Sequence, residues 1–337
     1  MSSVVVQQLA EAGSSESDAH DPRQLDSDMR QVLDSWSKLA GKPIAQANVP
    51  EARAMPSLEV AQRRLVGDAP AGGIEVSTLG IPGPLSEIKL RIYRPEGVTG
   101  VRPIVLYFHG GIFVFGDIAT AVATPRELVR RAGAIVIASH YRLAPESRFP
   151  AAHEDAWAVW NWVIANAAEL GGDPKRVAVV GEDAGGNLAL NLAIRARDTA
   201  FTVPIHVGLV SPMAAMMFEL PSHRDATGGT YVDTPALQWA SRKLFRDKEQ
   251  LRDARMNLAG RVDLDGLPPT TVILARHDPL RSEGEALADA MRRSGVWVDA
   301  TVYEGVTHGF FPLYRMVNKA LFAQAQLGTN LMAAFDR

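Results

Sequence analysis

One turn of the chain places a carboxylate where many enzymes carry a hydroxyl. Residues 177–187 have the sequence VAVVGEDAGGN; an apolar run predicts a strand before Gly181, and a helical pattern starts at Ala184. A strand that enters a helix through a glycine-flanked tight turn is typical of the pattern G-x-S-x-G, with a nucleophilic serine at the tip. Here the tip residue is Asp183. The chemistry of this protein therefore depends on what a carboxylate does there.

The elements that must position Asp183 are alternating strands and helices. Apolar or alternating runs predict eight strands, at about 73–81, 87–95, 103–111, 134–142, 176–183, 205–212, 270–278 and 296–305. Helical periodicity occurs at about 25–39, 58–65, 120–132, 152–168, 184–198, 283–294 and 317–335. This order predicts an α/β protein with a mostly parallel sheet covered on both faces. Residues 212–260 contain helical pieces without a strand, which indicates an insertion over one end of the sheet.

Composition excludes several classes of function. The 337 residues are 47% apolar, enough for one large core or two modest domains, and the net charge of −3 gives no electrostatic basis for binding nucleic acid or an anionic membrane. There is no cysteine, no His/Asp/Glu cluster with metal spacing and no phosphate-cradling loop, so we expect neither metal nor cofactor. No apolar run approaches the ~20 residues of a membrane span, and the N-terminus lacks a secretory pattern. A cytoplasmic enzyme is the expectation.

Four stretches together resemble the α/β-hydrolase fold, in particular the bacterial hormone-sensitive-lipase-like esterases. They are YFHGGIFVFGD (107–117), YRLAPESRFPAAHEDAWAVWNWV (141–163), GGDPKRVAVVGEDAGGN (171–187), and the pair RHDPLRSEG (276–284) and VTHGFF (306–311). The resemblance covers about residues 75–330 and implies an eight-stranded, mostly parallel sheet flanked by helices. It also implies a catalytic domain at 67–337 and a helical cap, built from an N-terminal segment with cap helices at 1–66 and the insertion at about 212–260. Related proteins often dimerise, so a homodimer is expected by analogy.

The resemblance assigns roles to individual residues. Asp183 matches the nucleophile, His308 the base and Asp278 the acid that orients the histidine. The oxyanion hole is expected from backbone amides near Gly110, Gly111, Ile112 and Ala184. The family's third glycine is replaced by Ile112, whose amide is expected to donate only if its backbone avoids positive φ, which a β-branched residue resists.

Three interpretations of Asp183 compete. The first is an inactive or degenerate esterase, although no single-base change converts a serine codon to an aspartate codon and Ile112 has changed as well. The second is carboxylesterase or lactonase chemistry. A carboxylate that attacks an ester carbonyl must expel a far more basic alkoxide, so the adduct would return to reactants unless the ester is activated or the lactone strained. Asp183 could instead act as a base on water.

The third interpretation, which we favour, is attack by Asp183 on a saturated carbon of a small apolar substrate, as in epoxide hydrolases and haloalkane dehalogenases of this fold. His308 would then activate water to hydrolyse the ester. The ionised Asp183 should keep His308 protonated at rest, and esterification removes that charge so that His308 becomes a base. This order suits a base that is needed only in the second step.

The remaining pocket residues are candidates for binding the substrate. Tyr231 and His223, in the predicted cap, are candidate proton donors for an opening epoxide, whereas Trp239 and Trp36 could hold a halide. Phe113 is expected to line the pocket. Two other classes of function keep the same pocket: a non-hydrolytic lyase or cyclase that uses Asp183 and His308 as an acid–base pair, and a ligand-binding protein.

Overall fold

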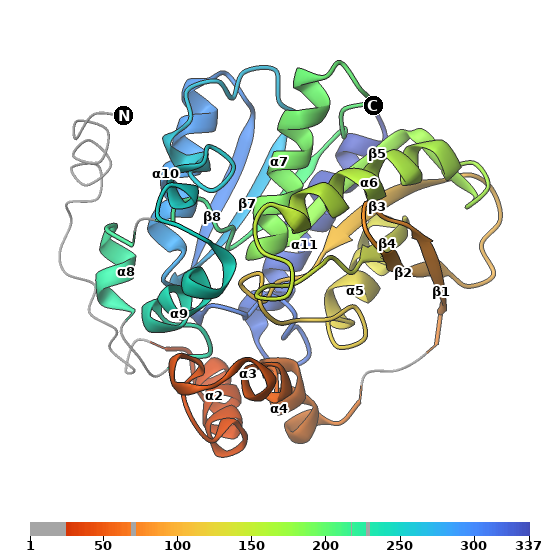
Figure 1. Ribbon diagram of the computed structural model, residues 1–337. Coiled ribbons are helices and arrows are strands. Elements are labelled where there is room, and N and C mark those ends of the chain that lie inside the picture. The colour runs from red at the N-terminus through yellow and green to blue at the C-terminus, as the bar shows by residue number, and fades with distance from the viewer. Residues whose placement is uncertain (1–24, 69–71, 217, 227–229) are drawn as a thin grey trace.

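A single eight-stranded sheet forms the centre of the molecule (Figure 1). The computed structural model describes residues 25–68, 72–216, 218–226 and 230–337. The strands are β1 (Ile74–Pro82), β2 (Glu87–Pro95), β3 (Arg102–Phe108), β4 (Ile135–Ser139), β5 (Gly172–Glu182), β6 (Val207–Val210), β7 (Thr270–His277) and β8 (Val298–Thr307). Their order is β1-β2-β4-β3-β5-β6-β7-β8, antiparallel on both sides of β2 and parallel from β4 to β8. The carboxyl ends of the parallel strands therefore share one edge.

Helices cover both faces of this sheet, which is why its central strands are apolar throughout. Helices α6 (Ala151–Asn166), α7 (Ala184–Asp198) and α10 (Arg281–Arg293) share one apolar cluster with Ile104, Leu106 and Phe108. Helices α5 (Ala123–Ala132) and α11 (Asn318–Phe335) pack on the other face with Val105 and Tyr107. The alternation along β3 assigns neighbouring residues to opposite faces, as the two-residue period of a strand requires.

Short helices from two distant segments pack against each other at the carboxyl edge of the sheet (Figure 1). The N-terminal segment contains α2 (Ser27–Ala40), the 3₁₀ turn η2 (Ile44–Gln46), α3 (Val49–Ala54) and α4 (Leu58–Val66). The 212–260 insertion contains α8 (Pro221–Asp225), α9 (Thr234–Leu244), η3 (Gln250–Arg252) and η4 (Leu258–Gly260). The indole of Trp239 donates to the Ala47 carbonyl and joins the two segments, while the indole of Trp36 donates to Pro56 within the first.

The predicted architecture is confirmed, with small differences at element ends. All eight predicted strands occur, and the described part of residues 212–260 contains helices and no strand. The helices at 44–54 were not predicted, although Asn48 and Glu51 form a capping box that the spacing N-x-x-E could have indicated. Residues 1–24 of the predicted N-terminal segment lie outside the described residues. No helix in the described ranges is long and apolar enough to cross a membrane.

Candidate active site

Asp183 is held at the tip of a strained turn between β5 and α7. Its φ of 53° and ψ of −115° lie in a region that non-glycine residues rarely adopt. The flanking glycines make the turn possible: a Cβ on Gly181 would collide with the Gly185 carbonyl, and a Cβ on Gly185 would collide with the Phe108 carbonyl. The strand, the glycines and the helix N-terminus thus aim the Asp183 side chain out of the sheet edge, where the helix dipole favours negative charge.

The two carboxylate oxygens of Asp183 have different surroundings. Oδ2 accepts hydrogen bonds from the backbone amides of Gly111 and Ile112, both at 2.8 Å. Oδ1 is buried and has no hydrogen-bond partner among the described residues. Burial raises the pKa of Asp183, and the two amides and His308 oppose that shift. One oxygen is therefore anchored, and the other has no hydrogen bond within the described structure.

Two of the four amides predicted for an oxyanion hole, those of Gly111 and Ile112, donate to Asp183 itself. Ile112 adopts a φ of 44° and Phe113 a φ of 62°, so the prediction that Ile112 must avoid positive φ in order to donate is wrong. The hydrogen bonds to Asp183 and the packing of the surrounding core stabilise the strained backbone at Ile112 and Phe113. Gly110 allows its backbone to lie close to Asp183, because a Cβ at this position would lie only 3.2 Å from the Asp183 Cβ. Its amide is not among the donors to the Asp183 carboxylate in the described structure. Ala184 begins helix α7, and within the described chain its amide is not a donor to this carboxylate.

His308 is paired with Asp278, as the sequence predicts. The imidazole Nδ1 lies 3.0 Å from Asp278 Oδ2 and 3.1 Å from Oδ1, and both side chains are buried. Burial alone would lower the pKa of His308, but the carboxylates of Asp278, Asp183 and Glu182 outweigh it and raise the pKa to about 9. The resting imidazole is therefore protonated at neutral pH, as expected beside an ionised Asp183.

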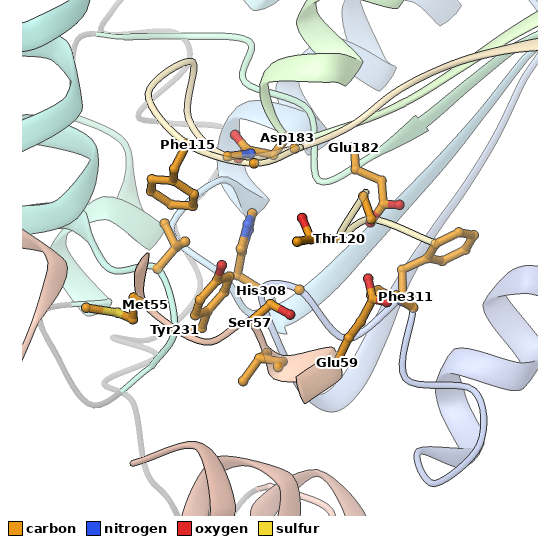
Figure 2. Close-up of a pocket in the computed structure, with 18 of the residues that line it drawn as sticks. Met55, Ser57, Glu59, Phe115, Thr120, Glu182, Asp183, Tyr231, His308 and Phe311 are labelled. Carbon is orange, nitrogen blue, oxygen red and sulfur yellow. The ribbon is translucent and has the colours of Figure 1, made fainter. Parts of the chain in front are cut away.

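A cavity of about 420 Å³ adjoins Asp183 and His308 (Figure 2). The cavity is lined by Asp183 and His308, by residues 52–60 of the N-terminal segment and by Tyr231 of the insertion. Tyr231 is held edge-on by the rings of Trp36 and Phe115. Burial and the charges of Asp183 and Glu59 raise the pKa of Tyr231, so its phenol keeps its proton.

Four residues predicted for the pocket lie outside the cavity lining, namely Phe113, His223, Trp239 and Trp36. Phe113 turns into the core, where its ring stacks on His153. The buried His223 ring lies 3.3 Å from the Glu283 carboxylate, and the Trp239 indole donates its hydrogen bond to the Ala47 carbonyl. Each prediction failed because chain position near the site does not fix the direction of the side chain.

The structure adds four polar residues to the site that the sequence did not single out. Glu182 accepts hydrogen bonds at 2.6 Å from the hydroxyls of Tyr107 and Thr124. Glu59 and Thr120 line the same end of the cavity as Glu182 and Tyr107. No sequence pattern marks these residues, since they come from three separate elements and one loop. Within the described ranges, no group of three His, Asp or Glu side chains could hold a metal ion.

Comparison with known proteins agrees with this geometry. Residues 105–312 match the family model described as the alpha/beta hydrolase fold. The chain belongs to that family. It is 33% identical over 294 residues to carboxylesterase NlhH of Mycobacterium tuberculosis, which covers 85% of this chain and 88% of that protein. It is 32% identical over 237 residues to an ethyl acetate hydrolase of Pseudomonas putida, with 69% of this chain and 74% of that protein covered.

Solved structures give the same result. A hyperthermophilic esterase from the archaeon Pyrobaculum calidifontis superposes with a TM-score of 0.84 at 33% identity, covering 92% of this chain and 98% of that chain. A thermostable esterase from Pseudomonas putida superposes with a TM-score of 0.86 at 30% identity, covering 94% and 99%. The chain is thus an enzyme of the hydrolase type, related to hormone-sensitive-lipase-like carboxylesterases. These likenesses do not extend to an aspartate nucleophile.

Proposed function

We propose that this hydrolase acts through a covalent ester on Asp183, formed by attack on a saturated, electrophilic carbon of a small substrate such as an epoxide. The observation that supports the proposal most directly is that the two oxygens of the Asp183 carboxylate have different hydrogen-bond partners. Oδ2 is anchored by the amides of Gly111 and Ile112, whereas Oδ1 has no hydrogen-bond partner among the described residues, and Asp183 lines the cavity. A carboxylate nucleophile needs one held oxygen and one free oxygen.

The first step forms a bond between Asp183 Oδ1 and the substrate carbon and breaks the bond from that carbon to its leaving oxygen. The electron pair of that bond moves to the oxygen, which takes a proton from the Tyr231 hydroxyl. Tyr231 suits this role because it lines the cavity, remains protonated and has no hydrogen-bond partner for its hydroxyl among the described residues. This step needs no base, so a protonated His308 does not hinder it.

The second step hydrolyses the ester. Esterification removes the negative charge of Asp183, which lowers the pKa of His308 and lets it release its proton and then take one from water. The water oxygen attacks Asp183 Cγ, and the negative charge develops on Oδ2, where the amides of Gly111 and Ile112 already point. The proton that His308 first releases restores the Tyr231 hydroxyl. Collapse breaks the bond between Cγ and Oδ1, and Oδ1 leaves with the substrate carbon as the alcohol. The alcohol takes the proton of the hydroxyl that water delivered, so the carboxylate re-forms with the water oxygen in it.

Ester hydrolysis is the second candidate, favoured by the relatives, which are named as esterases and ester hydrolases. The occupied amide pair argues against it. A substrate ester carbonyl would need the same amides of Gly111 and Ile112 that Asp183 Oδ2 already uses. An ester substrate would therefore have to displace Oδ2, with Asp183 then acting as a base on water.

The test is oxygen labelling at Asp183. The enzyme is incubated in ¹⁸O water with a panel of epoxides, alkyl halides, lactones and activated esters, and then digested with trypsin in normal water. Because attack by water at Cγ leaves one water oxygen on the enzyme, we expect ¹⁸O in the peptide of residues 177–195 after several turnovers. The peptide of residues 277–281, which contains Asp278, is the internal control. Turnover of any panel member without label at Asp183 would reject the covalent mechanism for that substrate.

A further inference from the structure

One end of the cavity is acidic, and the other is apolar. Figure 2 shows Glu182, Thr120 and Glu59 on one side of His308, with Phe115 and Met55 on the other. Glu182 immediately precedes Asp183 on β5, while Glu59 comes from helix α4 of the N-terminal segment. Both carboxyl groups meet the start of helix α5, where Glu59 accepts from the Ala123 amide and Glu182 from the Thr124 hydroxyl.

The protein supplies no cation dedicated to this acidic end within the described cavity lining. The two basic residues of the lining are already paired: Arg53 forms a two-pronged ion pair with Glu146, and His308 is bound to Asp278. Arg63, on the same helix as Glu59, has only a weak favourable effect on it, smaller than the unfavourable effect of Glu182. The negative charge at this end is therefore poorly compensated.

Two buried polar atoms of residues that line the cavity have no hydrogen-bond partner in the described structure. Asp183 is 3% exposed and lines the cavity, and its Oδ1 lacks a partner in the described structure. The Ser211 hydroxyl, which is 3% exposed in the same lining, lacks one as well. Buried polar atoms are normally satisfied, so these atoms indicate a missing polar partner.

Electrostatics between the two glutamates agree with this view. Burial and the adjacent Glu182 raise the pKa of Glu59 to about 8. Burial also raises the pKa of Glu182, against the hydrogen bonds of Thr124 and Tyr107. Two like charges held close together in a partly buried site retain a proton, and an ammonium group of a ligand can take the place of that proton.

We propose that the Glu59–Glu182 end of the cavity binds a cationic amine of the substrate, with the electrophilic carbon at Asp183 and an apolar group against Phe115 and Met55. The position of the electrophilic carbon rests on the proposed function, but recognition of the amine does not. An ammonium group offers three donors and a charge, whereas an alcohol of the same shape offers one donor and no charge.

The test uses two unreactive probes of matched shape, the phenethylammonium ion and 2-phenylethanol, with binding measured by calorimetry at pH 7. Because charge-assisted hydrogen bonds exceed neutral ones by a kcal/mol or more, we expect the ammonium ion to bind roughly ten-fold more tightly than the alcohol. Glu59→Gln should remove that preference and leave alcohol binding unchanged. Glu75→Gln, at an exposed glutamate on β1, is the matched control and should change neither.

Equal binding of both probes to the parent enzyme overturns the proposal without any need for a variant. A Glu59→Gln variant that loses both probes alike also overturns it, because Glu59 would then only hold helix α4 in place. Neither measurement involves turnover. Amine recognition can therefore succeed while the labelling of Asp183 fails, or fail while the labelling succeeds.

Discussion

Two buried histidine–carboxylate pairs in this molecule have different surroundings, since one lies beside the cavity and the other is enclosed by protein. His308 and Asp278 lie 3.0 Å apart beside the cavity, and His223 and Glu283 lie 3.3 Å apart beneath the insertion. The Glu283 carboxylate also accepts hydrogen bonds from the backbone amides of Ala214 and Ala215, so all of its interactions stabilise the fold. The first pair faces open space and a further carboxylate, that of Asp183.

The difference teaches that residue type alone does not make a histidine reactive. Sequence position made both His308 and His223 candidates for chemistry, yet only His308 lines the cavity. The His223–Glu283 pair, which is enclosed by protein, connects the insertion to helix α10. In the His308–Asp278 pair beside the cavity, the pKa of His308 depends on the charges in that cavity. The predictions below test this separation of a reactive pair from a structural one.

The largest expected effect is on the reactive pair. His308→Gln should slow turnover by roughly 10²–10⁴-fold, the range for loss of a general base. Because the first step needs no base, the variant should accumulate the Asp183 ester, visible as added mass in the intact protein. His223→Gln is the control and should show no adduct. If His308→Gln neither slows turnover nor traps an adduct, the two pairs do not differ in function.

The structural pair should respond in stability. Glu283→Ala removes the acceptor for the Ala214 and Ala215 amides and leaves His223 buried without its partner. The free energy of unfolding should fall by about 3 kcal/mol, as for other broken buried pairs. Urea denaturation followed by circular dichroism measures it. An unchanged midpoint would show that the insertion is not tied to α10 through this carboxylate.

Tyr231 tests whether the cavity supplies an acid. Tyr231→Phe keeps the ring between Trp36 and Phe115 and removes only the hydroxyl. Formation of the Asp183 ester should slow by roughly 10²-fold or less for epoxides, whose oxygen needs a proton, and should be unaffected for alkyl halides. Rapid-quench mass spectrometry of the adduct separates the two. Equal slowing of both substrates would assign Tyr231 a packing role.

The smallest expected effect is a pKa shift. Asp183→Asn removes one of the carboxylates that favour the His308 imidazolium, so the pKa of His308 should fall below its resting value of about 9. In the parent, His308 is protonated below about pH 9; in the variant it should lose its proton at a lower pH. NMR titration of the His308 imidazole in the parent and the variant measures this shift. A pKa that stays at about 9 would mean that Asp278 and Glu182 set it without Asp183.

The sequence by itself determined the sheet, the strained turn and the trio of side chains that we propose to react, Asp183, Asp278 and His308. Strand and helix periods are local, and the glycines around Asp183 and the order of Asp183, Asp278 and His308 can be read along the chain. Because the carboxyl ends of parallel strands meet at one edge, that order was enough to bring the three side chains together.

Only the tertiary structure decided what surrounds the trio. Phe113, His223 and Trp239 were placed near the cavity by their position in the chain, and packing turned each of them elsewhere. Glu59 has no local signal, and it lines the same cavity as Glu182 only because the N-terminal segment packs at the carboxyl edge of the sheet. Long-range docking and side-chain direction depend on the whole core, so no short stretch of sequence specifies them.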